Sequence, residues 1–129
     1  MYGFKTQLTI PFDAAVEKVT EALKKERFGV LTDIDVKVTL KAKLDIDRLP
    51  YRILGACNPS LANKAIEADP DIGLLLPCNV VVREEANGDI TVVFMDTEVV
   101  LKIVDKPEIH ALGTEVKTLL TRACKNIQA

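Results

Sequence analysis

The sequence has few of the residue types that mark several common classes of function. It contains no tryptophan, one histidine and three cysteines in 129 residues, and aromatic residues make up only 5%. With so few aromatic side chains, we do not expect a surface on which nucleic-acid bases stack. The 17 basic and 19 acidic residues give a net charge of −2. Without a basic excess, neither nucleic acid nor an anionic membrane is an expected partner.

Long hydrophobic runs are also missing. The most apolar stretch, LLLPCNVVV at 74–82, is interrupted by proline and asparagine and is far shorter than the ~20 residues of a membrane-spanning helix. The opening segment, MYGFKTQLTIPF, has one lysine and no apolar run, unlike a secretory signal. An odd number of cysteines does not suit a disulfide framework. We therefore expect a cytoplasmic protein with free thiols, folded as a single domain over residues 1–129.

Motifs of the common catalytic and metal sites do not occur. There is no glycine-rich phosphate loop, no Ser-His-Asp set and no HExxH sequence. The only histidine, His110, falls off the apolar stripe of its predicted helix, and a zinc site would need four ligands. Asp96 and Glu98 follow the predicted strand 90–95 as a pair of carboxylates, and we interpret them as exposed turn residues. We expect no metal and no cofactor, and no catalytic residue can be assigned.

Hydrophobic periodicity predicts a mixture of strands and helices. Alternating or continuous apolar residues predict strands at 4–10, 30–38, 51–57, 72–84 (with a break at Pro77) and 90–95. Apolar residues three and four apart predict helices from Phe12 to about Gly29, from Asn58-Pro59 to Asp69, and from Pro107 onward. Segment 39–49 is interpreted as a helical turn plus a loop, Asn87-Gly88 predicts a hairpin, and 96–104 is either a short strand or a helical turn. The order β-α-β-β-α-β-β-α indicates an α+β fold, with helices on one face of an antiparallel sheet.

The dipeptide Cys-Asn occurs twice, and both copies fall at informative places. Cys57-Asn58 ends the third predicted strand, where asparagine is a preferred helix cap and Pro59 suits the first helical position. Cys78-Asn79 lies within the fourth predicted strand. If these strands are neighbours, the two pairs reach a common rim and form a polar notch in an apolar pocket. The candidate ligand-binding residues are then Cys57, Asn58, Cys78 and Asn79, with Leu74, Leu76 and Met95 as apolar walls.

Each of these residues also has a plain structural explanation. Free cysteines are among the most commonly buried residues, so both thiols are more often packing groups than reactive ones. Asn58 caps a helix, and Asn79 can bond backbone groups left unpaired by the break at Pro77. Alternatively, Cys57 and Cys78 together would hold a soft metal or form a reversible disulfide, although 21 residues separate them and no CxxC spacing occurs.

The run YRILGACNPSLANKAIEADPDIGLLLPCNVVV, of which 55–82 is the most specific part, is followed by a short glycine hairpin and VVFMD. In these residues the chain resembles the family called domain of unknown function 302, and the resemblance extends over nearly the whole sequence. It implies a curved antiparallel sheet backed by helices, similar to TATA-binding-protein-like folds and often paired as a homodimer. Thr97 stands where members of that family often carry proline. No activity follows from the resemblance.

Three functional hypotheses remain. The first is a homodimeric module that binds a small molecule near the two Cys-Asn pairs. The second is a thiol protein in which Cys57 reacts and Cys78 acts as the resolving thiol or as a second metal ligand. The third is a self-association protein, which predicts no pocket larger than a few water molecules near these residues. Whether the chain is an enzyme is left open.

Overall fold

A five-stranded antiparallel sheet forms the centre of the molecule. The structure is a computed structural model and describes residues 1–128. The strands are β1 (Gly3–Leu8), β2 (Gly29–Asp35), β3 (Tyr51–Cys57), β4 (Cys78–Glu84) and β5 (Ile90–Met95), in the sheet order β1-β5-β4-β3-β2. All neighbours pair antiparallel, so the predicted α+β class is confirmed.

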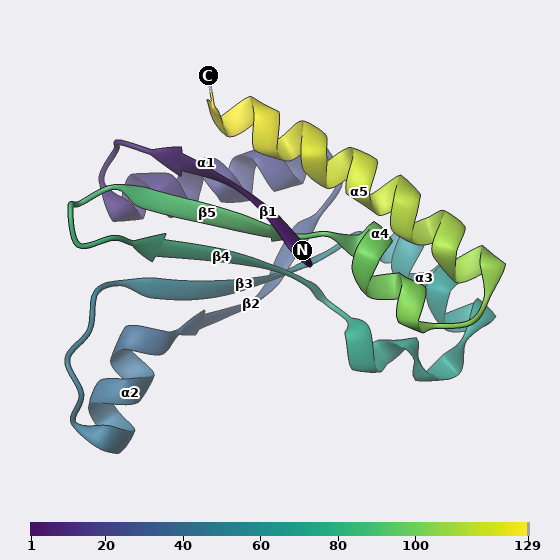
Figure 1. Cartoon of the computed structure of the whole chain (residues 1–129), viewed down its shortest axis with the longest axis horizontal. Coiled ribbons are helices and arrows are strands. Elements are labelled where there is room, and N and C mark those ends of the chain that lie inside the picture. Colours follow the sequence, from purple (N-terminus) through teal and green to yellow (C-terminus); the bar gives the residue numbers. More distant parts are fainter. Residues whose placement is uncertain (129) are drawn as a thin grey trace.

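The longest helices lie on one face of this sheet (Figure 1). The α-helices are α1 (Phe12–Lys25), α2 (Val36–Leu44), α3 (Pro59–Ala68), α4 (Thr97–Val100) and α5 (Pro107–Gln128), and two 3-10 helices are η1 (Pro70–Leu75) and η2 (Leu101–Ile103). Helix α5 contacts α1, α3 and α4 and so ties this layer together. Helix α2 stands apart from the other helices, near the end of β2 and beside β3, and has no buried residue of its own.

Buried side chains form two clusters. The main core lies between the sheet and the helices α1 and α5, and its members are Leu8, Ala15, Val19, Ala22, Leu23, Phe28, Leu54, Ala56, Leu61, Cys78, Val80, Val82, Ile90, Val92, Phe94, Val116, Leu120, Ala123, Cys124 and Ile127. The side core is smaller and consists of Ala65, Ile72, Leu101 and Ile109. Leu112 of α5 packs against both clusters, so the two meet along that helix.

The predicted strand at 72–84 is wrong in its first half. Residues 70–75 form η1, and β4 begins only at Cys78. Asp69 favours this local helix because its side chain accepts a hydrogen bond from the Asp71 N–H at 3.1 Å. Pro77 follows and cannot donate to the ladder, since proline has no N–H. Continuous apolar sequence suits a buried turn as well as a strand.

Two other predicted boundaries are also wrong. Helix α1 ends at Lys25, because Arg27 adopts a left-handed conformation (φ 67°) and the Phe28 N–H bonds back to Leu23 O at 2.9 Å. The second strand ends at Asp35, whose carboxylate accepts a hydrogen bond from the Val38 N–H at 3.0 Å and so caps α2. The predicted element order therefore lacks α2.

The remaining elements agree more closely with the sequence. The hairpin at Asn87-Gly88 is confirmed, although only Gly88 has a positive φ (91°). Segment 96–104 is helical, as α4 and η2. Among the apolar residues of α3, Leu61 and Ala65 are buried, whereas Ile66 is 46% exposed.

Candidate functional site

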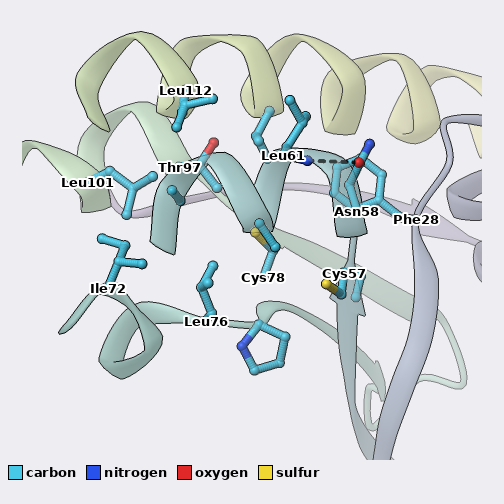
Figure 2. A pocket seen from close by; sticks show the side chains of 15 residues that line it. Phe28, Cys57, Asn58, Leu61, Ile72, Leu76, Cys78, Thr97, Leu101 and Leu112 are labelled. Atoms are coloured by element: carbon cyan, nitrogen blue, oxygen red, sulfur yellow. Dashed lines mark hydrogen bonds between the residues drawn. The ribbon is translucent and has the colours of Figure 1, made fainter. Parts of the chain in front are cut away.

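An apolar pocket lies where β3 ends, β4 begins and the two cores meet (Figure 2). Its walls are almost wholly apolar, and its volume is ≈ 40 Å³. The main core contributes Phe28, Ala56, Leu61, Cys78 and Val116; the side core contributes Ala65, Ile72 and Leu101; and Cys57, Asn58, Ala62, Leu76, Pro77, Thr97 and Leu112 complete the lining. The pocket is thus the gap between two clusters that do not interlock fully.

The junction of β3 and α3 positions one wall. Asn58 is the N-cap of α3, and its Oδ1 accepts a hydrogen bond from the Leu61 N–H at 3.3 Å. Pro59 follows at the first helical position, as the sequence predicts. The cap fixes the first turn of α3, so Leu61 is directed into the pocket while Asn58 stays buried at 8% exposure.

The pairing of β3 with β4 positions the opposite wall. Ala56 pairs with Cys78 and Gly55 with Asn79, so the strands that carry the two Cys-Asn pairs are neighbours as predicted. Gly55 permits this arrangement, because a Cβ there would lie 2.1 Å from Thr32 Oγ1 and 2.8 Å from Pro77 Cγ. The absence of a side chain lets Pro77 close over the end of β3.

The two thiols at the pocket differ in exposure. Cys57 is half-buried and Cys78 is buried, and both sulfur atoms point toward the pocket in Figure 2. Burial raises the pKa of Cys78 to about 11, with a smaller contribution from the nearby Cys57. Burial likewise raises the pKa of Cys124, a buried residue of α5. No disulfide joins the three cysteines.

The ligand-binding residues predicted from the sequence do not all lie on the same face of the sheet. Cys57, Asn58, Leu76 and Cys78 line the pocket. Asn79 does not, because side chains alternate along β4 and its neighbours Cys78 and Val80 face the helices.

Asn79 and Met95 instead lie on the opposite face of the sheet, where they line a shallow hollow with Val81 and Val93. Leu74 in η1 is 88% exposed. The structure therefore does not bring the two amides into one polar notch.

For several residues that line the pocket, the sequence gives no indication of this position. Ile72, Leu101 and Leu112 look like ordinary core positions of three separate segments, and only the packing of η1, η2 and α5 brings them together. Thr97 is 1% exposed and donates a hydrogen bond from Oγ1 to Gly113 O at 2.7 Å. That contact brings α4 against α5 and closes this side of the pocket.

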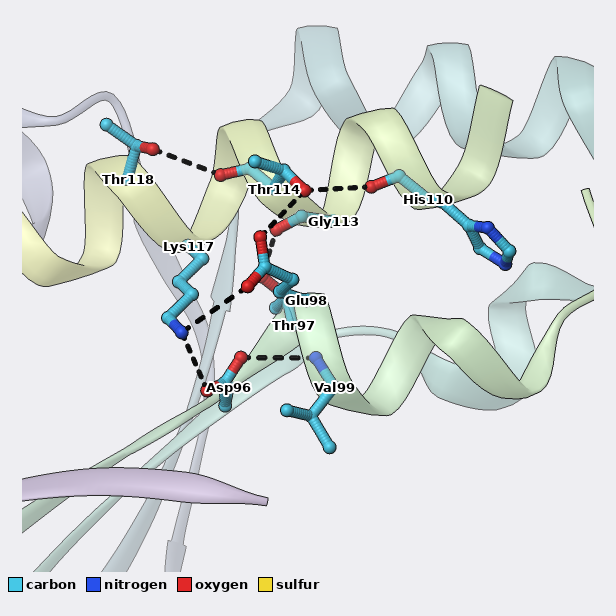
Figure 3. Close-up of polar contacts among 9 residues, drawn as sticks. All are labelled: Asp96, Thr97, Glu98, Val99, His110, Gly113, Thr114, Lys117 and Thr118. Carbon is cyan, nitrogen blue, oxygen red and sulfur yellow. Dashed lines mark hydrogen bonds and ion pairs between the residues drawn. The ribbon is translucent and has the colours of Figure 1, made fainter. Parts of the chain in front are cut away.

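The carboxylates Asp96 and Glu98 belong to a polar cluster that joins α4 to α5 (Figure 3). Lys117 Nζ lies 3.0 Å from Asp96 Oδ2 and 3.6 Å from Glu98 Oε1. Asp96 also caps α4 by accepting a hydrogen bond from the Val99 N–H at 3.2 Å. Burial raises the pKa of Asp96, but Lys117 and the backbone hydrogen bonds outweigh burial and hold that pKa below its usual value. The interpretation of Asp96 as an exposed turn residue is wrong, since it is 8% exposed.

The described residues contain neither a cluster of metal ligands nor a helix that could span a membrane. Within residues 1–128, no three His, Cys, Asp or Glu side chains gather closely enough to hold a metal ion. His110 Nε2 instead lies 2.5 Å from Val104 O, in a local contact beside the start of α5. None of the helices described is both long and apolar enough to cross a bilayer.

The fold and the pocket define a small α+β protein with an apolar pocket at the end of its sheet. Residues 4–127 match the family model described as Domain of unknown function DUF302, so the chain belongs to this family. It is also similar to the solved structure of the uncharacterized conserved protein DUF302 from Bacillus stearothermophilus, with a TM-score of 0.90, 25% identity and coverage of 98% of each chain. No curated protein matches the chain.

Proposed function

We propose that the protein binds a small, largely apolar molecule in the pocket between its two cores. The observation that carries this proposal is the composition of the lining: two separately packed clusters face a common space, with Asn58 and Thr97 as its polar residues and Cys57 and Cys78 as its thiols. Most natural small-molecule sites are apolar clefts with a few polar groups that orient the ligand.

The volume limits the size of the ligand. A cavity needs at least about 10–15 Å³ of such volume to hold one water molecule, and a water in the liquid takes about 30 Å³, so ≈ 40 Å³ corresponds to one to three waters. Apolar walls offer such waters few hydrogen bonds, which favours an apolar occupant. An apolar cavity of about 150 Å³ binds benzene, so only one or two carbon atoms fit this space as it stands, and a larger ligand requires Leu61 or Leu76 to change rotamer.

The proposal also includes a homodimer. Six of the twelve exposed large apolar side chains of the described residues lie between 31 and 49, in β2 and in the segment 36–49, which we call the α2 arm. On the open face of the sheet, directly paired positions form an apolar row from Ile34 through Ile53 and Val81 to Val93. A second copy related by a two-fold axis would cover both surfaces at once, because each copy presents the same patch to the other.

A thiol function is the second candidate, and the pairing of Ala56 with Cys78 favours it because that register puts Cys57 next to Cys78. A metal or redox role would require Cys78 as a thiolate, which its raised pKa opposes. A self-association protein without a ligand is the third candidate, and the small pocket volume is compatible with it. Under all three, the cytoplasm is the proposed location, since reducing compartments keep thiols unpaired.

A titration with 1-butanol tests the main proposal. Backbone amide signals of pocket residues such as Leu61 and Leu101 should shift and saturate, because the alcohol enters the pocket. Ala62→Leu places a larger side chain in the lining and should abolish the shifts, whereas Ala111→Leu, the same change at an exposed position of α5, should preserve them. Shifts that do not saturate, or that survive Ala62→Leu, would refute binding in the pocket. Native mass spectrometry of protein from its own host would then report any retained ligand and the subunit number.

A further inference from the structure

A groove with an excess of positive charge adjoins the pocket. This basic groove has a volume of ≈ 450 Å³ and lies between the end of α1, the start of α3 and the middle of α5. Its charged lining residues are Lys25, Glu26, Arg27, Lys64, Glu115 and Arg122. Four cations thus face two carboxylates, a surplus of two positive charges in a protein whose net charge is −2.

Three of these cations have no carboxylate partner. Arg122 pairs with Glu26, with Nη1 3.2 Å from Oε1. Lys25, Arg27 and Lys64 make no ion pair and no side-chain hydrogen bond within residues 1–128, although lysines elsewhere, such as Lys117, do. Like charges gathered in one concavity raise the local concentration of anions.

The basic groove and the apolar pocket share a wall. Asn58 and Leu61 line both cavities, so the first turn of α3 separates the apolar space from the charged one. Asn58 is 8% exposed, and its Oδ1 is occupied by the Leu61 N–H, while its Nδ2 has no hydrogen-bond partner among the described residues. In Figure 2 this nitrogen points away from the pocket. Since the described residues contain no fully buried side-chain nitrogen without a partner, Asn58 Nδ2 keeps some exposure and is available to a ligand on the side of the groove.

We propose that the basic groove binds the anionic head of a ligand whose short apolar tail occupies the pocket. The inference rests on the proposed function and narrows the ligand class to a small amphiphile that carries a carboxylate or a phosphate ester. Arg27 and Lys64 supply positive charge to the head, Asn58 Nδ2 donates a hydrogen bond, and the N-terminus of α3 adds its partial positive charge. Leu61 then lies between the head and the tail.

The test compares three probes of equal chain length on the full-length protein: butyrate, butyl phosphate and 1-butanol. Affinities are measured at low salt from the amide shifts of Asn58 and Leu61. The anions should bind about fivefold or more tightly than the alcohol, because unpaired surface charges contribute up to about 1 kcal/mol each. The tighter of the two anions identifies the head group. Raising the salt concentration should reduce this preference while leaving 1-butanol unaffected.

Two double variants distinguish anion binding in the basic groove from a general effect of the protein's charge. The double substitution Arg27→Gln with Lys64→Gln should remove the preference for anions and keep 1-butanol binding. Lys37→Gln with Lys43→Gln, the same loss of charge on α2, should change neither. Equal affinity for butyrate and 1-butanol would overturn the inference and leave the apolar pocket standing. Anion binding that persists in Ala62→Leu would overturn the link between groove and pocket. Failure of all three probes to bind would refute the proposed function and the inference together.

Discussion

Gly113 sets how closely α4 approaches α5 beside the pocket. A Cβ at this position would lie 2.8 Å from Thr97 O and 3.3 Å from Leu101 Cβ, and the backbone atom cannot move away without shifting α4. Gly113→Ala should therefore lower the free energy of unfolding by about 1–3 kcal/mol, as other overpacked sites do. Helix propensity alone would predict the opposite effect, because alanine in place of glycine within a helix raises the free energy of unfolding by up to about 1 kcal/mol.

Urea denaturation measures this effect, and Gly73→Ala is the matched control. Nothing lies within 4 Å of a Cβ built at Gly73. The control should change the free energy of unfolding by no more than about 0.5 kcal/mol. A stabilised Gly113→Ala variant would show that the contact between α4 and α5 is looser than described.

Asp96 should make stability depend on pH in the acid range. Its pKa is lowered in the folded state, so its contribution is present above the unfolded-state value near 3.8 and is lost as the pH falls through the folded-state value. Asp96→Asn removes the charge that pairs with Lys117, and at neutral pH it should cost about 1 kcal/mol, because Lys117 is partly exposed.

The comparison is made by urea denaturation at pH 7 and at pH 3. The difference between Asp96→Asn and the original chain should shrink at the lower pH, where the native carboxylate is becoming protonated. Asp105→Asn, at an exposed position, should track the original chain at both pH values. A difference of the same size at both pH values would contradict the role of the charge.

The three thiols should react in an order set by burial. At pH 7.5 a thiol with a pKa of about 11 is only about 0.03% thiolate, so Cys78 should resist iodoacetamide in the folded protein. Cys57 is half-buried and should react first, while Cys78 and Cys124 should react fully only after unfolding. Mass spectrometry of peptides from timed samples reports the order. Alkylation of Cys78 at the rate of Cys57 would revive the thiol hypothesis.

At the scale of elements, the sequence predicts those that have one strong periodicity or a clear cap. All five strands are predicted at least in part, and α3 begins at Asn58-Pro59 as expected because asparagine and proline have specific roles there. Helix α2 is predicted only in part, as the helical turn within 39–49. Its start at Val36 is missed because Val36 and Val38 continue the alternation of β2, and only the cap at Asp35 begins a new element. Helix η1 has a strand-like composition, and only Asp69 hints at a cap.

The candidate site could be predicted only where adjacent strands define it. The neighbourhood of Cys57 and Cys78 follows from one pairing of strands. Which face of the sheet Asn79 occupies depends on which residues of β4 point toward the helices. That alternation could not be assigned from the sequence, because the strand was expected to begin before Pro77. The basic groove lies between three helices that are far apart in the sequence, so no local sequence pattern predicts it. The single domain remains a prediction.

At the scale of the whole molecule, the open sheet face and the α2 arm should support a homodimer. Ile34→Lys places a charge in the apolar row and should convert the dimer into a monomer, because the buried charge would have no partner. Ile66→Lys is the matched control, since Ile34 and Ile66 are 49% and 46% exposed and Ile66 lies on α3. Light scattering coupled to size-exclusion chromatography measures the mass. A monomeric original chain, or equal effects of the two variants, would contradict the proposed interface.

The central claim concerns the space between the two cores, and crystals of the protein under xenon pressure test it most directly. Xenon enters dry apolar cavities and needs no hydrogen bond. We predict a xenon atom bounded by Leu61, Leu76 and Leu101 in crystals of the original chain, and none there in Ala62→Leu. Ordered water molecules at that position, or side chains that fill it, would contradict the account.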